Sequence, residues 1–221
     1  MTTIYLVRHA MSQSNIEGNF CGVTDVPLSE KGYRQLEFLA KRFAEIRLDR
    51  IYSSPLMRAV ETAKAIGRAQ RLDVTLRHEL HEIDVGELEG LDFRRLTANY
   101  PDEMERYIHD PGAFSSPGGE AMAQVSARAV NALGRIAAEN PGRTVAVVSH
   151  GDFIRAYTCS AQGKPLSELK NLKHSFNTGV TRVDYDDKLR PHVVFSGDVS
   201  HLPRSELTLF EEYVNGDGLK G

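Results

Sequence analysis

The sequence predicts an α/β fold, a three-layer sandwich in which helices cover both faces of a mostly parallel central sheet. Apolar, β-branched runs alternate along the chain with segments of helical periodicity. Of the two clearest runs, 3–7 is followed by Arg8-His9 and 144–149 by His150. The 221 residues contain no internal repeat, low-complexity tract or linker. We therefore expect one domain over residues 1–221.

The remaining elements follow from local signals. Ser29 is expected to cap a helix, and Ser54-Pro55 to begin another that runs to Ala69. The first of these helices should bury Tyr33, Leu36, Leu39, Ala40 and Phe43. The other expected strands are 50–53, 73–77, 179–185 and 192–195, with a turn at 186–187 between the last two. The other expected helices are 91–107, broken at Pro101, and then 120–140 and 152–161, while 17–27 and 111–119 read as loops and 203–221 as a tail.

Composition excludes several classes of partner and location. The net charge of −3 argues against non-specific nucleic-acid binding, so any anion site must be a local concentration of cations. Two cysteines, Cys21 and Cys159, do not make a disulfide framework, and we expect a reducing cytoplasm. No apolar run is long enough to span a membrane, and the N-terminus lacks a signal-peptide pattern.

Polar side chains follow three of the expected strands. The first strand ends in Arg8-His9, the second is followed by Arg58, and the run at 144–149 ends in His150. Parallel strands place their carboxyl ends at one edge of a sheet, which is where such sheets bind ligands. Arg offers a planar fork of donors to a phosphate, and His can act as a nucleophile near neutral pH. This edge is therefore predicted to bind an anion, with helix N-termini adding to its attraction.

At this point the sequence resembles the histidine phosphatase superfamily, which includes the cofactor-dependent phosphoglycerate mutases. Five stretches resemble the motifs of that family in its order: 6–10 (LVRHA), 52–59 (YSSPLMRA), 81–90 (HEIDVGELEG), 117–120 (PGGE) and 147–151 (VVSHG). The resemblance covers roughly residues 3–200. It implies an enzyme, a hydrolase acting on phosphoric monoesters, with a small helical cap inserted at about 77–119.

The resemblance also implies roles for individual residues. His9 would be the nucleophile that forms a phosphohistidine, and Glu82 would protonate the leaving oxygen and later activate water. The phosphate would be held by Arg8, Ser12, Asn15, Arg58, His150 and Gly151. No metal and no cofactor are implied, because Arg and His supply the positive charge.

Some alternatives stay open on the sequence alone. Four acidic residues, Glu79, Asp84, Glu87 and Glu89, compete with Glu82 for the role of the acid. Ser12 and Asn15 could instead brace their loop. His78 and His81 are three residues apart, which is not the spacing of the helical two-histidine metal motif. The remaining histidines, His174 among them, are expected to be structural or exposed, and Arg94-Arg95 either solvated or in contact with a substrate tail.

The sequence departs from the family pattern at three places, and the last two of these favour a phosphatase over a mutase. Ala10 stands where glycine is usual, Met11 stands where the mutases have Glu, and the segment 91–117 is short and lacks a tandem arginine late in it. We expect a phosphatase of the broad-specificity or α-ribazole-phosphate type, acting on a small phosphorylated metabolite. The alternatives are a phosphoglycerate mutase and a weakly active protein that binds phosphorylated ligands. A homodimer is compatible with the resemblance.

Overall fold

The computed structural model describes residues 1–207, which fold around one six-stranded sheet of order β3-β2-β4-β1-β5-β6. The first four strands pair in parallel, whereas β5 pairs antiparallel with both β1 and β6. The predicted α/β class with a mostly parallel sheet is thereby confirmed. The strands are β1 (Thr2–Arg8), β2 (Arg50–Ser53), β3 (Val74–Leu76), β4 (Thr144–Ser149), β5 (Val180–Tyr185) and β6 (Pro191–Asp198).

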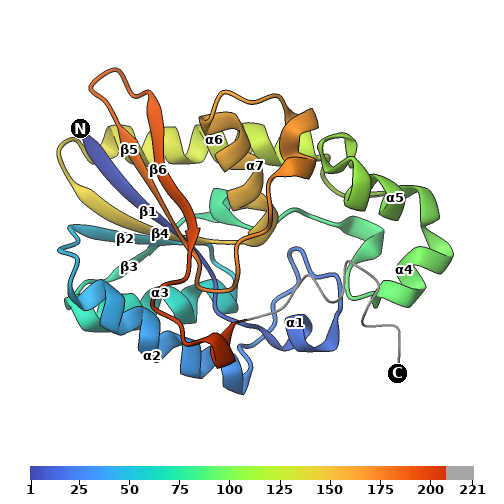
Figure 1. The fold of residues 1–221 in the computed structure, drawn as a ribbon, viewed down its shortest axis with the longest axis horizontal. Coiled ribbons are helices and arrows are strands. Elements are labelled where there is room, and N and C mark those ends of the chain that lie inside the picture. Colours follow the sequence, from blue (N-terminus) through green and yellow to red (C-terminus); the bar gives the residue numbers. More distant parts are fainter. Residues whose placement is uncertain (208–221) are drawn as a thin grey trace.

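Helices cover both faces of this sheet (Figure 1). One face carries α6 and α7, the other carries α2 and α3, and the two short helices α4 and α5 extend at one end of the molecule. Pro101 separates α4 from α5, as predicted. The helices are α1 (Gln13–Glu17), α2 (Glu30–Ala44), α3 (Met57–Gln70), α4 (Phe93–Asn99), α5 (Pro101–His109), α6 (Met122–Glu139) and α7 (Gly151–Ala161).

The central strand β1 feeds two separate apolar cores. Ile4 and Leu6 pack into the cluster beneath α6 and α7, whereas Val7 packs into the cluster beneath α2 and α3. This alternation is the period of two that a pleated strand imposes. Each fully buried aliphatic side chain contributes roughly 1.5–3 kcal/mol. Because β1 is buried on both faces, its sequence reads as a continuous apolar run that stops at Arg8.

Two predicted helix details are wrong. Tyr33 is 51% exposed, because the buried stripe of α2 is formed by Gly32, Gln35, Leu36, Leu39 and Phe43. The Gln35 side chain is buried because it accepts from the Met11 N–H and donates to the Glu206 carbonyl. Helix α3 begins at Met57 and not beside Ser54, and the Met57 N–H donates to Asp25 Oδ1 over 2.6 Å.

Shorter segments also differ from the sequence predictions. The five-residue helix α1 lies just before the predicted loop 17–27, capped by Ser12. The β5–β6 turn is longer than predicted, since the Asp186 N–H donates to the Arg190 carbonyl. Part of the predicted tail, Arg204–Glu206, forms a turn that bonds to α2, and residues 208–221 of the tail lie outside the described residues. Within residues 1–207, no helix is both long and apolar enough to cross a membrane.

Candidate active site

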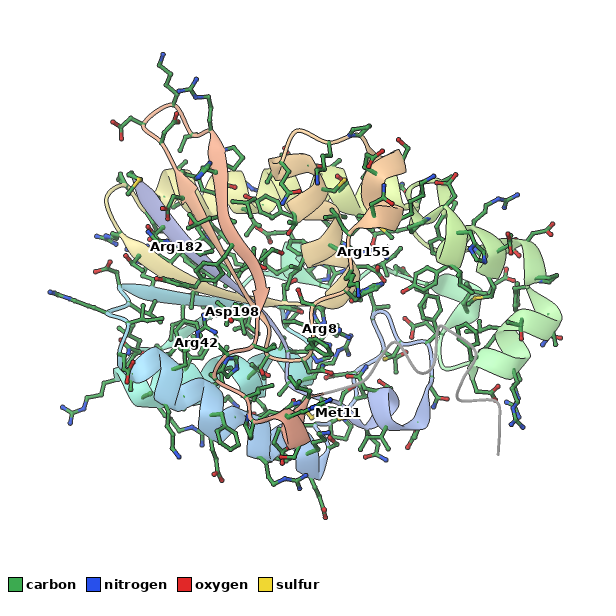
Figure 2. All side chains as sticks on the ribbon, in the orientation of Figure 1. Arg8, Met11, Arg42, Arg155, Arg182 and Asp198 are labelled. Carbon is green, nitrogen blue, oxygen red and sulfur yellow. The ribbon has the colours of Figure 1, made fainter. Side chains whose placement is uncertain are left out.

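A cavity lies at the sheet edge where β1, β2 and β4 end. Arg8, one of its lining residues, lies there between the sheet and the loops around α1 (Figure 2). Of the eight residues that the sequence predicts for the site, seven line it: Arg8, His9, Ser12, Asn15, Arg58, Glu82 and Gly151. The eighth, His150, does not line the cavity itself, but its ring centroid lies 5.2 Å from that of His9. The topology therefore brings together side chains that lie up to 142 residues apart in the chain.

His9 is buried in this cavity with one ring nitrogen already committed. Its Nδ1 lies 2.7 Å from the Ala10 carbonyl oxygen. A carbonyl can only accept, so Nδ1 carries the proton and Nε2 keeps a free lone pair. Burial, Arg58 and Arg8 all lower the pKa of His9 well below its ordinary value. The ring is therefore neutral near pH 7, which is the state that a nucleophilic nitrogen requires.

Both arginines are buried and bonded to backbone carbonyls, and Arg58 is bonded to two of them. It is 2% exposed, and its guanidinium donates to the carbonyls of Gly22, over 2.6 Å, and Thr24, over 2.9 Å. A Cβ at position 22 would lie 2.1 Å from the Ile83 carbonyl, so only glycine lets this loop pack closely enough. Arg8 is also buried and donates to the Ser175 carbonyl. Backbone carbonyls thus help to orient both guanidinium groups at the cavity, where their positive charge favours an anion.

His150 lies beside His9 and contacts Ser54. Its Nε2 is 2.7 Å from Ser54 Oγ, which explains why Ser54 is not the cap of α3 that the sequence predicts. Its Nδ1 is buried and has no hydrogen-bond partner within the described part of the chain. Burial, Arg58 and His9 lower the pKa of His150 well below its ordinary value. A second neutral imidazole with one uncommitted nitrogen thus stands next to the first.

Two acidic residues line the cavity within residues 1–207, Glu82 and Asp152, and Glu82 is the one that the sequence predicts. Its carboxylate accepts from the N–H groups of Ile83, Phe153 and Asp152, over 3.0, 3.1 and 3.2 Å. These donors favour the ionised form, but burial and the Asp152 carboxylate outweigh them and raise the pKa of Glu82. A carboxyl group with a raised pKa suits proton donation.

The four acidic rivals of Glu82 make contacts elsewhere. Glu79 pairs with Arg135, Glu87 accepts from the Tyr100 hydroxyl, and Glu89 accepts from Gly22 and Val23 N–H groups. The Asp84 carboxylate accepts from the Gly86 N–H. None of these four residues lines the cavity as described for residues 1–207. The geometry therefore favours Glu82 over its rivals.

The N-terminus of α7 lies at the cavity, where helix N-termini were expected to add to the attraction for an anion. Two of its N–H groups, those of Asp152 and Phe153, donate to the Glu82 carboxylate. Gly151 still lines the cavity, and a Cβ there would lie 3.5 Å from the Arg8 guanidinium carbon, an ordinary contact. The helix terminus thus serves mainly to hold the carboxyl group.

Ser12 and Asn15 brace their own loop while facing the cavity. The Ser12 N–H donates to Asn15 Oδ1 over 3.1 Å, and the Asn15 N–H donates to Ser12 Oγ, which together form the cap of α1. Asn177 Nδ2 also donates to Asn15 Oδ1 and to the His9 carbonyl. The amide oxygen of Asn15 is therefore committed to structure, and its NH₂ end is the part available to an anion.

The site also contains groups that the sequence analysis missed. Asp152 is buried and accepts from the Tyr107 hydroxyl over 2.9 Å, which ties α5 to the start of α7. His174 lines the cavity, contrary to its expected structural or exposed role, and its Nε2 lies 2.9 Å from Arg155 Nη1. Asp152 follows the 147–151 motif and could have been suspected from that position. His174 follows an irregular segment and carries no local signal.

The side of the cavity away from the sheet is apolar. Phe20, Phe93, Leu96, Met104 and Tyr107 line it, from the loop after α1 and from α4 and α5. The Phe20 and Tyr107 rings meet edge to face, with centroids 4.8 Å apart. Arg94 and Arg95 on α4 are exposed, and Arg95 pairs with Asp92.

The residues present do not form a metal centre in the described part of the chain. No group of three or more His, Cys, Asp or Glu side chains within residues 1–207 is arranged to hold a metal ion. His78 and His81 stack edge to face, with centroids 5.1 Å apart, and His81 Nδ1 lies 2.6 Å from the Glu82 carbonyl. This pair therefore packs beside the acid-bearing segment.

The profile of the histidine phosphatase superfamily (branch 1) matches residues 4–197. The chain belongs to this superfamily. Phosphoserine phosphatase 1 of Hydrogenobacter thermophilus is 36% identical over 169 residues, which are 76% of this chain and 80% of that protein. A probable phosphoglycerate mutase GpmB of Cronobacter sakazakii is 33% identical over 208 residues, 91% of this chain and 95% of the relative.

A solved structure agrees with this assignment to the histidine phosphatase superfamily. Bacillus stearothermophilus YhfR has a TM-score of 0.87 and 31% sequence identity, and the match covers 91% of this chain and 99% of that one. The family expectation drawn from the five motifs is thereby confirmed.

Proposed function

We propose that this histidine phosphatase superfamily member is a phosphomonoesterase that acts on a small phosphorylated metabolite through a phosphohistidine at His9. One observation carries the proposal: a neutral imidazole with a free Nε2 lies in a buried cavity that also holds Arg8, Arg58 and Glu82. Phosphoryl transfer needs an aligned nucleophile, positive charge at the equatorial oxygens and a proton for the leaving oxygen. These residues supply all three.

In the first half-reaction, His9 Nε2 attacks phosphorus and the bond from phosphorus to the substrate oxygen breaks. Glu82 gives its proton to that oxygen, and the alcohol leaves. Arg8, Arg58 and the NH₂ group of Asn15 would hold the three oxygens of the phosphoryl group, and Ser12 and the Gly151 N–H would add donors. The uncommitted Nδ1 of His150 would approach the phosphoryl group from beside His9.

In the second half-reaction, water attacks the phosphorus of phosphohistidine and the N–P bond breaks. The Glu82 carboxylate takes the proton from that water, which reverses its first role. Inorganic phosphate then leaves, and Glu82 is again protonated. The raised pKa of Glu82 serves both halves, because it eases proton donation and makes the carboxylate a stronger base.

The mutase alternative is supported by the GpmB relative. Against it, Met11 stands at the position where mutases have Glu, and its backbone contacts Gln35 and Ser29 beside the Arg204–Glu206 turn (Figure 2). Met11 is also not among the residues that line the cavity. Position 11 thus carries a thioether in place of the carboxylate with which a mutase would make an additional polar contact.

The leaving group would be recognised by the cap at about 77–119, which contributes α4 and α5 to the cavity wall. The phosphoserine phosphatase relative makes phosphoserine a first candidate substrate. We also infer a cytoplasmic location, supported by two cysteines that are both free thiols. A homodimer and the absence of nucleic-acid and membrane partners stay predictions from the sequence.

The decisive experiment is a panel of phosphoesters with purified protein, with release of inorganic phosphate as the readout. The panel contains p-nitrophenyl phosphate, phosphoserine and 3-phosphoglycerate, and His9→Ala serves as the blank. We expect hydrolysis of at least one ester by the wild type. Conversion of 3-phosphoglycerate into its 2-phospho isomer without phosphate release would establish the mutase, and binding without any turnover would establish a phospho-ligand-binding protein.

A further inference from the structure

The guanidinium of Arg128 contacts the segment that carries Glu82 from the side opposite the cavity. Arg128 belongs to α6, and its Nη1 donates to the carbonyls of Glu79 and His81, over 3.0 and 2.8 Å. Its Nη2 donates to the carbonyl of Glu82 itself, over 3.2 Å. Three backbone carbonyls within four consecutive residues thus converge on one side chain.

Glu120 holds this guanidinium in a fixed orientation. Its Oε1 accepts from Arg128 Nε over 3.0 Å, and its Oε2 accepts from Arg128 Nη2 over 2.7 Å. Oε2 also accepts from the Asp84 N–H, and the Glu120 N–H donates to the Asp84 carbonyl. The pair therefore grips residues on both sides of Glu82, from 79 to 84.

This arrangement uses the full donor capacity of arginine. Each of the five N–H donors of Arg128 has an acceptor at 2.7–3.2 Å. Lysine has three donors on a compact ammonium group and cannot span the same acceptors. Both side chains are largely buried, at 16% and 20% exposure, so the ion pair is shielded from water.

Glu82 is consequently held from two directions. Its carboxylate is bound by N–H groups at the start of α7, and its backbone carbonyl is bound by Arg128. Arg128 also lies over the Phe153 ring, 5.6 Å from its centroid, and the Phe153 N–H is one of the donors to the carboxylate. The same guanidinium thus contacts both elements that set the position of the carboxyl group.

We propose that Arg128, oriented by Glu120, is a positioning residue for proton transfer by Glu82. This inference rests on the proposed function, in which Glu82 protonates the leaving oxygen. An acid displaced by about 1 Å can lose roughly 100-fold in rate. Loss of Arg128 should therefore impair proton donation while the phosphate contacts of Arg8 and Arg58 remain.

The test compares two substrates that differ in their need for a proton. The nitrophenolate of p-nitrophenyl phosphate leaves without assistance, whereas an alkyl phosphate such as glycerol 1-phosphate requires a protonated leaving oxygen. The readout is kcat/KM, because it covers only the steps up to the phosphohistidine and excludes the hydrolysis that both esters share. For Arg128→Met we expect kcat/KM for the alkyl ester to fall about 10- to 100-fold and kcat/KM for the aryl ester to fall less than about 3-fold. KM should change little for either substrate. Glu120→Gln should shift the ratio in the same direction by a smaller factor.

Arg135→Met is the matched control. Arg135 lies two turns further along α6 and contacts the same segment, but only through the Glu79 side chain, and it is 64% exposed. We expect both rates to stay unchanged in this variant. If Arg128→Met does not fold, Arg128→Lys carries the test, with a partial loss confined to the alkyl ester.

Glu82→Gln on the same two substrates separates the possible failures. Suppose that Glu82→Gln slows hydrolysis of the alkyl ester more than that of the aryl ester. If the Arg128 variants then slow both esters equally, or slow neither, the positioning role of Arg128 is wrong, whereas the assignment of Glu82 as the acid stands. If Glu82→Gln lowers kcat/KM equally for both esters, the assignment of the acid is wrong and the positioning proposal is overturned with it. A selective loss in both variants supports the proposal.

Discussion

The two walls of the cavity differ in how they are built. The sheet wall consists of polar side chains from the ends of β1, β2 and β4, and backbone groups hold His9, Arg58 and Glu82 in place. The cap wall is apolar and is supplied by α4, α5 and the loop after α1. In the proposed mechanism the two walls would have different roles, because the sheet wall would bind and transfer the phosphoryl group and the cap wall would select the alcohol.

The largest loss of turnover is expected when the nucleophile of the sheet wall, His9, is removed. His9→Ala removes the only nitrogen positioned for attack in the proposed mechanism, so turnover should fall by about 10,000-fold or more. Binding of inorganic phosphate should persist, since Arg8 and Arg58 remain. Steady-state kinetics and phosphate inhibition or calorimetry check the two parts. Near-normal turnover in this variant would contradict the proposed mechanism.

The next effect concerns the acid. Glu82→Gln keeps the shape and one acceptor oxygen of the side chain but cannot donate a carboxyl proton. We expect kcat for alkyl phosphates to fall about 100- to 1,000-fold. For p-nitrophenyl phosphate the phosphorylation of His9 should be slowed much less, and kcat then depends on the second step, the dephosphorylation of His9. Burst-phase kinetics would separate the two steps.

A smaller effect is expected from the cap wall. Phe93→Ala removes an aromatic side chain from the apolar side, so KM for an aromatic ester such as 1-naphthyl phosphate should rise about 10-fold. Inhibition by inorganic phosphate should stay unchanged, because phosphate contacts only the sheet wall. Arg94→Ala is the control on the same helix, since Arg94 is exposed. A rise in KM in that variant would show that Arg94 contacts the substrate.

The smallest effect is expected at Asp152, which links the two walls through its hydrogen bond with Tyr107. Glu82 must be protonated to act as the acid, so kcat/KM for alkyl phosphates should fall as pH rises through the raised pKa of Glu82. Burial and Asp152 cause that rise, so Asp152→Asn should move this limb of the profile toward lower pH. The amide oxygen of Asn can still accept from Tyr107. A profile that does not move would show that Asp152 has no electrostatic influence on the acid.

Much of the fold and most of the cavity could be predicted from the sequence, for a common physical reason. The apolar runs at β1 and β4 are continuous because both faces are buried, and each stops where the chain reaches the sheet edge. Arg8 ends the first run and His150 follows the second, so both residues could be placed at the sheet edge from the sequence. Pro101 likewise marked the break between α4 and α5.

The features that escaped prediction depend on long-range packing. Tyr33 was expected to be buried, but Gln35 takes the position facing the core because it bonds to Met11 and Glu206. Ser54 reads locally as a helix cap, yet its hydroxyl contacts His150, which lies 96 residues further along the chain. The presence of His174 at the cavity and the Tyr107–Asp152 bond likewise depend on contacts that no local pattern encodes.

The hydrogen bond from His9 Nδ1 to the Ala10 carbonyl also dictates regiochemistry. With that nitrogen blocked, the phosphohistidine of the proposed mechanism would form as the tele isomer, phosphorylated on Nε2, and not as the pros isomer. Acid-quenched enzyme probed with isomer-selective antibodies or ³¹P chemical shifts would distinguish the two. A single main-chain oxygen thus specifies which of two chemically similar atoms becomes modified.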